Sequence, residues 1–84
     1  MIEFPVSDHY KNNVLDGDTI TRRGGWWTAV LLISDPRTGI PFIGLYRWQA
    51  TDTGWKLRKR FTFRKKEEFD TITGVIQKFS HKLL

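Results

Sequence analysis

The chain has 84 residues, a net charge of +5 at pH 7 and no cysteine. This length allows one small domain, and the absence of cysteine excludes disulfide bridges and thiolate metal sites. No apolar run approaches the roughly 20 residues of a membrane span, and the first ten residues lack the pattern of a signal peptide. We therefore expect a single domain over residues 1–84 that is cytoplasmic and not bound to a membrane, either nucleoid-associated or, if viral, inside a host cell.

Residues 1–25 are predicted to form a loop-rich segment, because turn-forming residues recur throughout it. These residues are Pro5, Asn12, Asn13, Asp16, Gly17, Asp18, Gly24 and Gly25. Two short strands are conceivable within the segment, one around Ile2–Val6 and one around Asp18–Arg22.

Residues 26–63 have the composition of a β-sheet. The stretches "WWTAVLLIS", "IPFIGLYRWQ" and "WKLRKRFTF" are rich in β-branched and aromatic residues, which favour strands. The connections "DPRTG" and "ATDTG" place Pro, Asp and Gly where tight turns need them. We predict three consecutive antiparallel strands here.

The third of these strands, 55–63, alternates in a way that predicts two different faces. Successive side chains of a strand point to opposite sides. The face that we expect to be mostly core carries Trp55, Leu57, Lys59, Phe61 and Phe63. The opposite, cationic face carries Lys56, Arg58 and Arg60.

The last segment, residues 66–83, is predicted to be a helix with one apolar stripe. The apolar residues recur at spacings of three and four, and they are Phe69, Ile72, Ile76, Phe79 and Leu83. Acidic residues lie in the first turn and basic residues in the last, as the helix dipole favours. The predicted fold is α+β, a curved antiparallel sheet of three to five strands followed by one C-terminal helix packed on one face.

Nothing in the sequence indicates catalysis. The two histidines, His9 and His81, lie far apart, and no group of residues has metal-ligand spacing. Glu67 and Glu68 are adjacent on the predicted helix, so they do not face each other, and a dipole role explains them. We therefore expect no enzyme, no cofactor, no metal and no small-molecule substrate.

Charge and aromatic content together favour single-stranded nucleic acid as the partner. Seven of the fourteen Lys and Arg residues lie between Lys56 and Lys66, and twelve of the 84 residues are aromatic. Unpaired bases stack on aromatic rings while cations follow the phosphates. We expect Lys56, Arg58 and Arg60 to hold phosphates. We expect bases to stack on Trp48, Trp55 and one of Trp26 and Trp27. The alternative is that the rings form core and subunit contacts and the basic strand is a protected sheet edge.

The residues from Trp27 to the C-terminus also resemble a known family, the positive cofactor four class of transcriptional coactivator domains, a whirly-like single-stranded-DNA-binding fold. The family's last strand is approximately Lys-Pro-x-x-Lys-Gly-Ile-x-Leu, and "WKLRKRFTF" places Lys59, Phe61 and Phe63 at its second Lys, its Ile and its Leu. The helix start "KKEEF" is also similar. The chain departs from the family in lacking its Pro, in having Arg60 in place of its Gly, and in one additional residue before the helix aromatic.

The resemblance implies a homodimer formed through the helices, with single-stranded DNA held across the sheets. It places the region of DNA contact at Arg47, Trp48, Lys56, Arg58, Lys59 and Arg60. The small size of the chain also favours a homodimer. We therefore expect sequence-independent binding of single-stranded DNA, or of RNA. The alternative function is a small protein-interaction module that binds an acidic protein, because Arg, Trp and Tyr also dominate protein hot spots.

Overall fold

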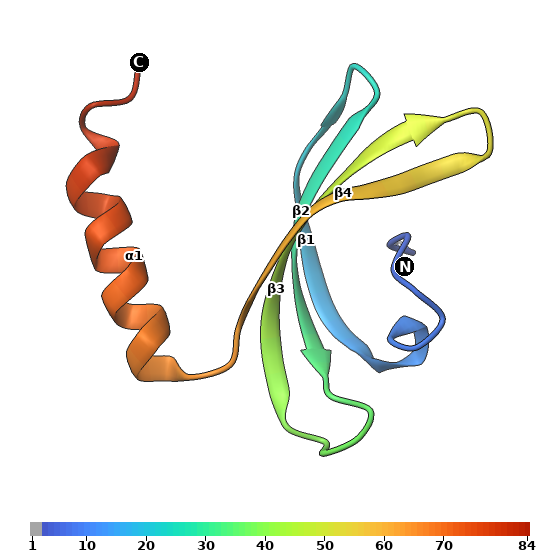
Figure 1. Ribbon diagram of the computed structural model, residues 1–84, viewed down its shortest axis with the longest axis horizontal. Helices are drawn as coiled ribbons and strands as arrows, with labels where there is room; N and C mark the ends of the chain where they lie inside the picture. The colour runs from blue at the N-terminus through green and yellow to red at the C-terminus, as the bar shows by residue number, and fades with distance from the viewer. Residues whose placement is uncertain (1–2) are drawn as a thin grey trace.

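The computed structural model describes residues 3–84 and contains one sheet and one long helix (Figure 1). A short 3-10 turn, Lys11–Asn13, precedes the first strand. The strands are β1 (Val14–Arg23), β2 (Trp26–Ser34), β3 (Pro41–Thr51) and β4 (Gly54–Phe63), and the helix is α1 (Lys66–Ser80). The four strands pair antiparallel in chain order. The α+β class, the antiparallel sheet and the C-terminal helix are therefore confirmed.

The first strand lies inside the segment that was predicted to be loop-rich. β1 extends the strand that was expected around Asp18–Arg22 to ten residues. It includes Asp16, Gly17 and Asp18, which had suggested a turn. Residues 3–6 form no strand, and Ile2 lies outside the described residues.

Close packing explains why residue 17 of β1 is a glycine. A methyl group on Gly17 would lie 2.6 Å from Leu31 Cδ2 and 2.8 Å from Phe4 Cε2. A glycine inside a strand often marks such a close approach of another part of the chain. The glycine in this turn-like stretch therefore reflects contact with the N-terminal segment.

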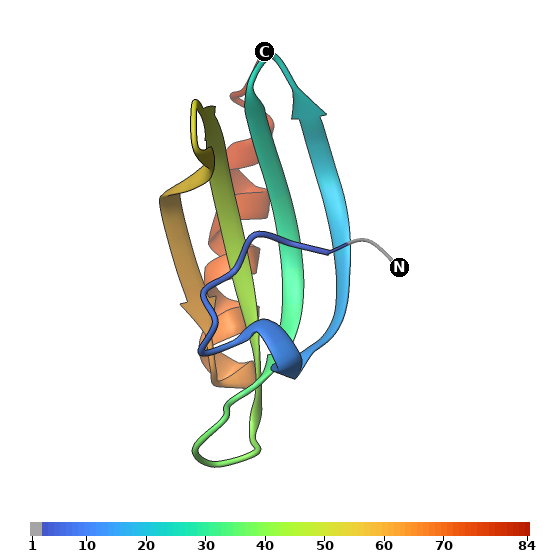
Figure 2. The same cartoon turned by 90° about the vertical axis from the view of Figure 1, so that its right-hand side faces the viewer.

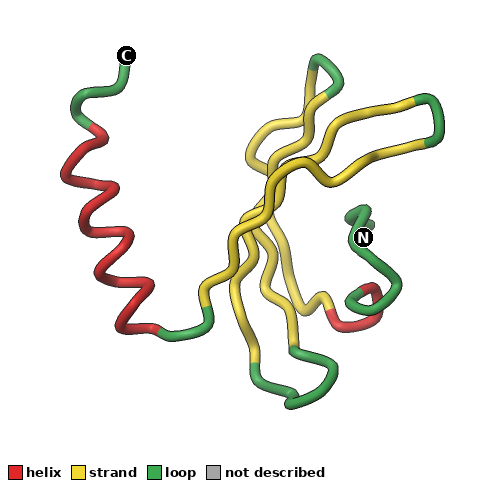
Figure 3. The backbone as a smooth tube through the Cα atoms, in the orientation of Figure 1, coloured by secondary structure: helices red, strands yellow, loops and turns green. Residues whose placement is uncertain are grey.

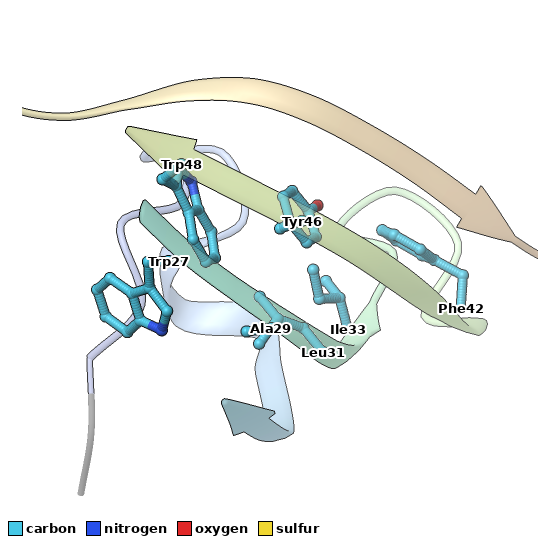
Figure 4. Close-up of a cluster of buried hydrophobic side chains, with 7 residues drawn as sticks. All are labelled: Trp27, Ala29, Leu31, Ile33, Phe42, Tyr46 and Trp48. Carbon is cyan, nitrogen blue, oxygen red and sulfur yellow. The ribbon is translucent and has the colours of Figure 1, made fainter. Parts of the chain in front are cut away.

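The core lies on one side of the sheet, which we call the covered face. Its buried side chains alternate along β2 and β3 (Figure 4): Trp27, Ala29, Leu31, Ile33, Phe42, Tyr46 and Trp48. The rings of Tyr46 and Trp48 stack with centroids 5.4 Å apart and planes 8° from parallel. The buried face of β2 accounts for every second residue of "WWTAVLLIS", while Trp26, Val30 and Leu32 put apolar side chains on its other face.

The N-terminal segment, residues 3–13, covers this core. Figure 2 shows it crossing in front of the sheet while α1 lies behind. Phe4 lies 5.6 Å from the ring of Trp27 and 6.3 Å from that of Trp48, between ring centroids. Val6 and Tyr10 also pack against the core. The sheet is therefore backed by the N-terminal segment, although the helix was predicted to back it.

The helix stands away from the sheet (Figures 1 and 3). No residue of α1 is buried. Its first turn touches the sheet through Phe69, which meets Phe63 edge to face at 5.2 Å. Farther along, the predicted apolar stripe is exposed, and Phe79 is 60% exposed. The prediction that the helix packs on one face of the sheet is therefore wrong within this chain.

Candidate nucleic-acid interface

A β-bulge in β4 divides the predicted cationic face. Arg47 pairs with Lys59 and Trp48 pairs with Leu57, so Arg58 is an extra residue on β4. A bulge of one residue reverses the side to which later side chains point. Lys56 and Arg60 therefore lie on opposite faces, and the strict alternation predicted from the sequence does not hold.

The nine predicted site residues are consequently split between the two faces. The register places Trp26, Arg47, Lys56 and Lys59 on the side opposite the core, which we call the open face. Arg58 reaches the same side, because its Nε donates a hydrogen bond of 2.8 Å to Oε1 of Gln49. The covered face carries the other four, Trp27, Trp48, Trp55 and Arg60.

Trp27 and Trp48 are core residues and do not form a base-stacking platform. Their exposed fractions are 2% and 1%. Trp55 is half-buried and meets Trp27 edge to face at 5.4 Å, while the guanidinium of Arg22 lies 4.0 Å from the centroid of Trp27. The sequence-based expectation that Trp48 stacks on bases is therefore wrong in this arrangement. Of the pair at the start of β2, Trp26 is the more accessible ring.

Five of the predicted residues form a cationic cluster at the hairpin end of the open face. The cluster consists of Trp26, Arg47, Lys56, Arg58 and Lys59. The Arg47 guanidinium carbon lies 4.5 Å from the centroid of the Trp26 ring, a cation–π geometry. This contact orients an Arg and an indole together at the surface. Sequence reasoning missed Arg23, which pairs with Trp26 across β1 and β2.

No carboxylate neutralises this cluster within residues 3–84. The ion pairs found there join Arg64 to Asp35 and Lys66 to Asp70. Arg47 and Lys59 instead lie directly opposite each other on β3 and β4. Like charges in this position destabilise a sheet. On the open face, Asp18 is on β1, the edge strand farthest from β4, where it pairs with Val30 of β2.

A shallow hollow of about 350 Å³ adjoins the cationic cluster on the open face. Its lining combines apolar and cationic residues: Thr28, Leu45, Tyr46, Arg47, Lys59, Arg60 and Phe61. Leu45 and Phe61 pair across β3 and β4 and are both exposed. The open face therefore changes from cationic at the hairpin end to apolar toward α1.

Three other features of residues 3–84 bear on function: possible metal ligands, membrane-spanning helices and shifted pKa values. Among residues 3–84, no three His, Cys, Asp or Glu side chains cluster as metal ligands. In the same part of the chain, no helix has the length and apolarity to cross a membrane. Titration shifts occur at Asp35, whose pKa is lowered by the Arg37 backbone N–H and by Arg64, and at Tyr46, whose pKa is raised by burial.

Comparisons with protein-family models, with curated proteins and with solved structures gave no match. The similarity to the positive cofactor four class therefore rests on the sequence features alone and stays a prediction.

Proposed function

We propose that the protein binds single-stranded nucleic acid through the cationic cluster on the open face. The observation that carries this proposal is the direct pairing of Arg47 with Lys59 without a carboxylate partner in residues 3–84. An exposed pair of like charges costs stability, and a polyanion would relieve that cost. Phosphates would lie along Arg47, Lys56, Arg58 and Lys59.

The aromatic content of the open face favours single strands over duplex. Trp26, held beside Arg47, offers a ring on which unpaired bases can stack. A duplex hides the faces of its bases and would use only the cations. Stacking and phosphate contacts carry no base-specific hydrogen bonds, so binding should depend little on sequence.

The proposal also includes a homodimer, because the chain has two unpartnered apolar surfaces. One is the stripe of α1, with Ile76 and Phe79 both exposed. The other is the apolar part of the open face, with Leu32, Leu45 and Phe61. Exposed apolar patches of this kind mark interaction sites. In a twofold-symmetric dimer, the α1 stripe of each subunit would pack on the apolar part of the open face of the other subunit. One interface would then cover both surfaces of each subunit.

Tryptophan fluorescence during titration with oligothymidine tests the binding proposal. We expect the single strand to quench the emission, salt to weaken the effect with a log–log slope of about −0.7 per neutralised phosphate, and a duplex of equal length to quench less. Trp26→Phe should remove most of the quenching. The matched control Trp55→Phe, on the covered face, should keep it.

Three results would contradict the proposal. Absence of quenching and of binding at low salt would exclude nucleic acid and would favour an acidic protein as the partner. Equal binding of duplex would remove the role of stacking. Quenching that survives Trp26→Phe but is lost in Trp55→Phe would move the site to the covered face.

A further inference from the structure

A second hollow lies on the covered face, between the sheet and the N-terminal segment. Its volume is about 260 Å³, slightly below the range of about 300–1,000 Å³ that is common for ligand pockets. Its lining residues are Pro5, Val6, Ser7, Tyr10, Tyr46, Trp48, Leu57 and Arg60. It is on the opposite side of the sheet from the cationic cluster.

Two of its lining residues bury polar atoms without a partner. Within residues 3–84, neither the Tyr46 hydroxyl nor the Trp48 Nε1–H makes a hydrogen bond of ordinary geometry, although the Arg60 guanidinium lies close enough to the hydroxyl to counter the rise that burial causes in its pKa. Both residues are almost completely buried, at 3% and 1% exposure. Buried polar atoms normally have a hydrogen-bond partner, and each exception requires an explanation. Both atoms belong to residues that line the same hollow, so a ligand in this hollow is the partner to test.

Arg60 gives the hollow its charge. It pairs with Tyr46 across β3 and β4, so the two side chains share the covered face. None of the lining residues is acidic, and Arg60 has no ion pair among the described residues. The Arg60 charge opposes the rise that burial causes in the pKa of Tyr46.

The donors define what the hollow can bind. The indole N–H of Trp48 and the guanidinium of Arg60 can only donate, and the Tyr46 hydroxyl is free to donate. Such a set matches an oxyanion, whose oxygens only accept. Among the other lining residues, Pro5, Val6 and Leu57 are apolar and suit a ligand with an apolar body.

We propose that this hollow binds a small organic anion, its oxyanion on Trp48, Tyr46 and Arg60 and its apolar body against the N-terminal segment. The site lies on the other face of the sheet from the cationic cluster, and Tyr46 and Arg60 also border the hollow beside that cluster. Because residues of the N-terminal segment form one wall, the anion would hold this segment on the sheet. The sequence contained no signal for this site, because the donors come from two strands and the wall from a segment that was expected to form loops.

The test is a titration of the ¹⁵N-labelled full chain with benzoate, followed by the indole N–H resonances of the four tryptophans. Assignment uses Trp48→Phe. We expect benzoate to shift the Trp48 indole resonance in a saturable manner at millimolar concentration. Benzamide, which has the same ring without the charge, should shift it at least tenfold less at equal concentration. Inorganic phosphate, an anion without an apolar body, should bind more weakly than benzoate.

Variants separate the site from general charge effects. Arg60→Gln, at an exposed position, should weaken benzoate binding at least tenfold, and Tyr46→Phe should weaken it while keeping the ring. Arg37→Gln removes the same charge in the β2–β3 turn and should leave binding unchanged. The proposal is overturned if benzoate leaves the Trp48 resonance unmoved, if benzamide matches benzoate, or if Arg60→Gln binds like the parent chain.

Discussion

Arg47 and Lys59 lie opposite each other on β3 and β4, and no carboxylate within residues 3–84 bonds to either. A sheet selected for stability alone would place an opposite charge at one of these positions. Substitution of either residue should therefore have two opposite effects. It should weaken the binding of a polyanion, and it should stabilise the folded chain because it removes the repulsion between the two charges.

We predict that Lys59→Gln lowers the affinity for oligothymidine and reduces the salt slope of log affinity by about 0.7, the value for one phosphate contact. The same change should raise the free energy of unfolding by about 0.2–1 kcal/mol, since it removes a repulsive cross-strand pair. Salt-dependent titrations and urea unfolding measure the two quantities. Arg37→Gln should change neither by a comparable amount, and a loss of stability in Lys59→Gln would contradict the repulsion argument.

The exposed stripe of α1 leads to a prediction about assembly. Ile76→Glu and Phe79→Glu each place a charge among apolar side chains of the proposed subunit interface, so we expect both variants to be monomeric. The single-chain fold should persist, because no residue of α1 is buried within the chain. Sedimentation equilibrium gives the mass, and circular dichroism gives the retained structure.

Gln77→Glu is the control for charge, because it introduces the same group beside Ile76 on the helix but outside the predicted apolar stripe. It should leave the dimer intact. A parent chain that sediments as a monomer at micromolar concentration would contradict the dimer, and the exposed stripe would then need another partner.

The sequence predicted β2, β3, β4 and α1 because each carried a local signal, whereas β1 lay in the segment that was predicted to be loop-rich. β-branched and aromatic residues between turn residues marked the three strands, and spacings of three and four marked α1. The face that each side chain occupies was harder to predict. It depends on the extra residue Arg58, and no local pattern within "WKLRKRFTF" distinguishes a bulged strand from a regular one.

The covering of the core was also beyond local reasoning. The apolar stripe of α1 led to the prediction that the helix covers the sheet, whereas the segment containing Phe4 and Val6 was expected to form loops and covers it instead. Which segment covers the core depends on the shape of the sheet surface, because the Phe4 ring fits into the space that Gly17 leaves next to Leu31. This is a contact between residues far apart in the sequence.

That contact gives a stability prediction. In Gly17→Ala the added methyl group would overlap Leu31 and Phe4, and overpacking of this kind costs about 1–3 kcal/mol. Gly74→Ala is a matched comparison, because within residues 3–84 no atom outside the neighbouring helix backbone lies within 4 Å of a methyl group added at this position in the middle of α1. Alanine there should stabilise the helix by up to about 1 kcal/mol. Urea unfolding measures both; a Gly74→Ala variant that also loses dimer would place Gly74 at the subunit contact.

The turn between β2 and β3 leads to a prediction about acid stability. The Asp35 carboxylate accepts a hydrogen bond of 2.8 Å from the Arg37 backbone N–H and pairs with Arg64 at 3.0 Å. Both interactions lower the pKa of Asp35 in the folded chain below its ordinary value of 3.8. Its contribution to stability is therefore complete above that value and is lost as the pH falls through the lowered folded pKa.

Asp35→Asn keeps an oxygen that can accept from the Arg37 N–H but removes the charge. We expect the variant to have a lower Tm than the parent chain at pH 7, and the difference to shrink as the pH falls below about 3.8, because the parent chain loses its carboxylate there. Thermal unfolding between pH 2 and pH 7 measures this. Asp52→Asn, in the exposed β3–β4 turn, is the control for net charge. A Tm difference that stays constant across this range would show that the Asp35 charge does not stabilise the turn.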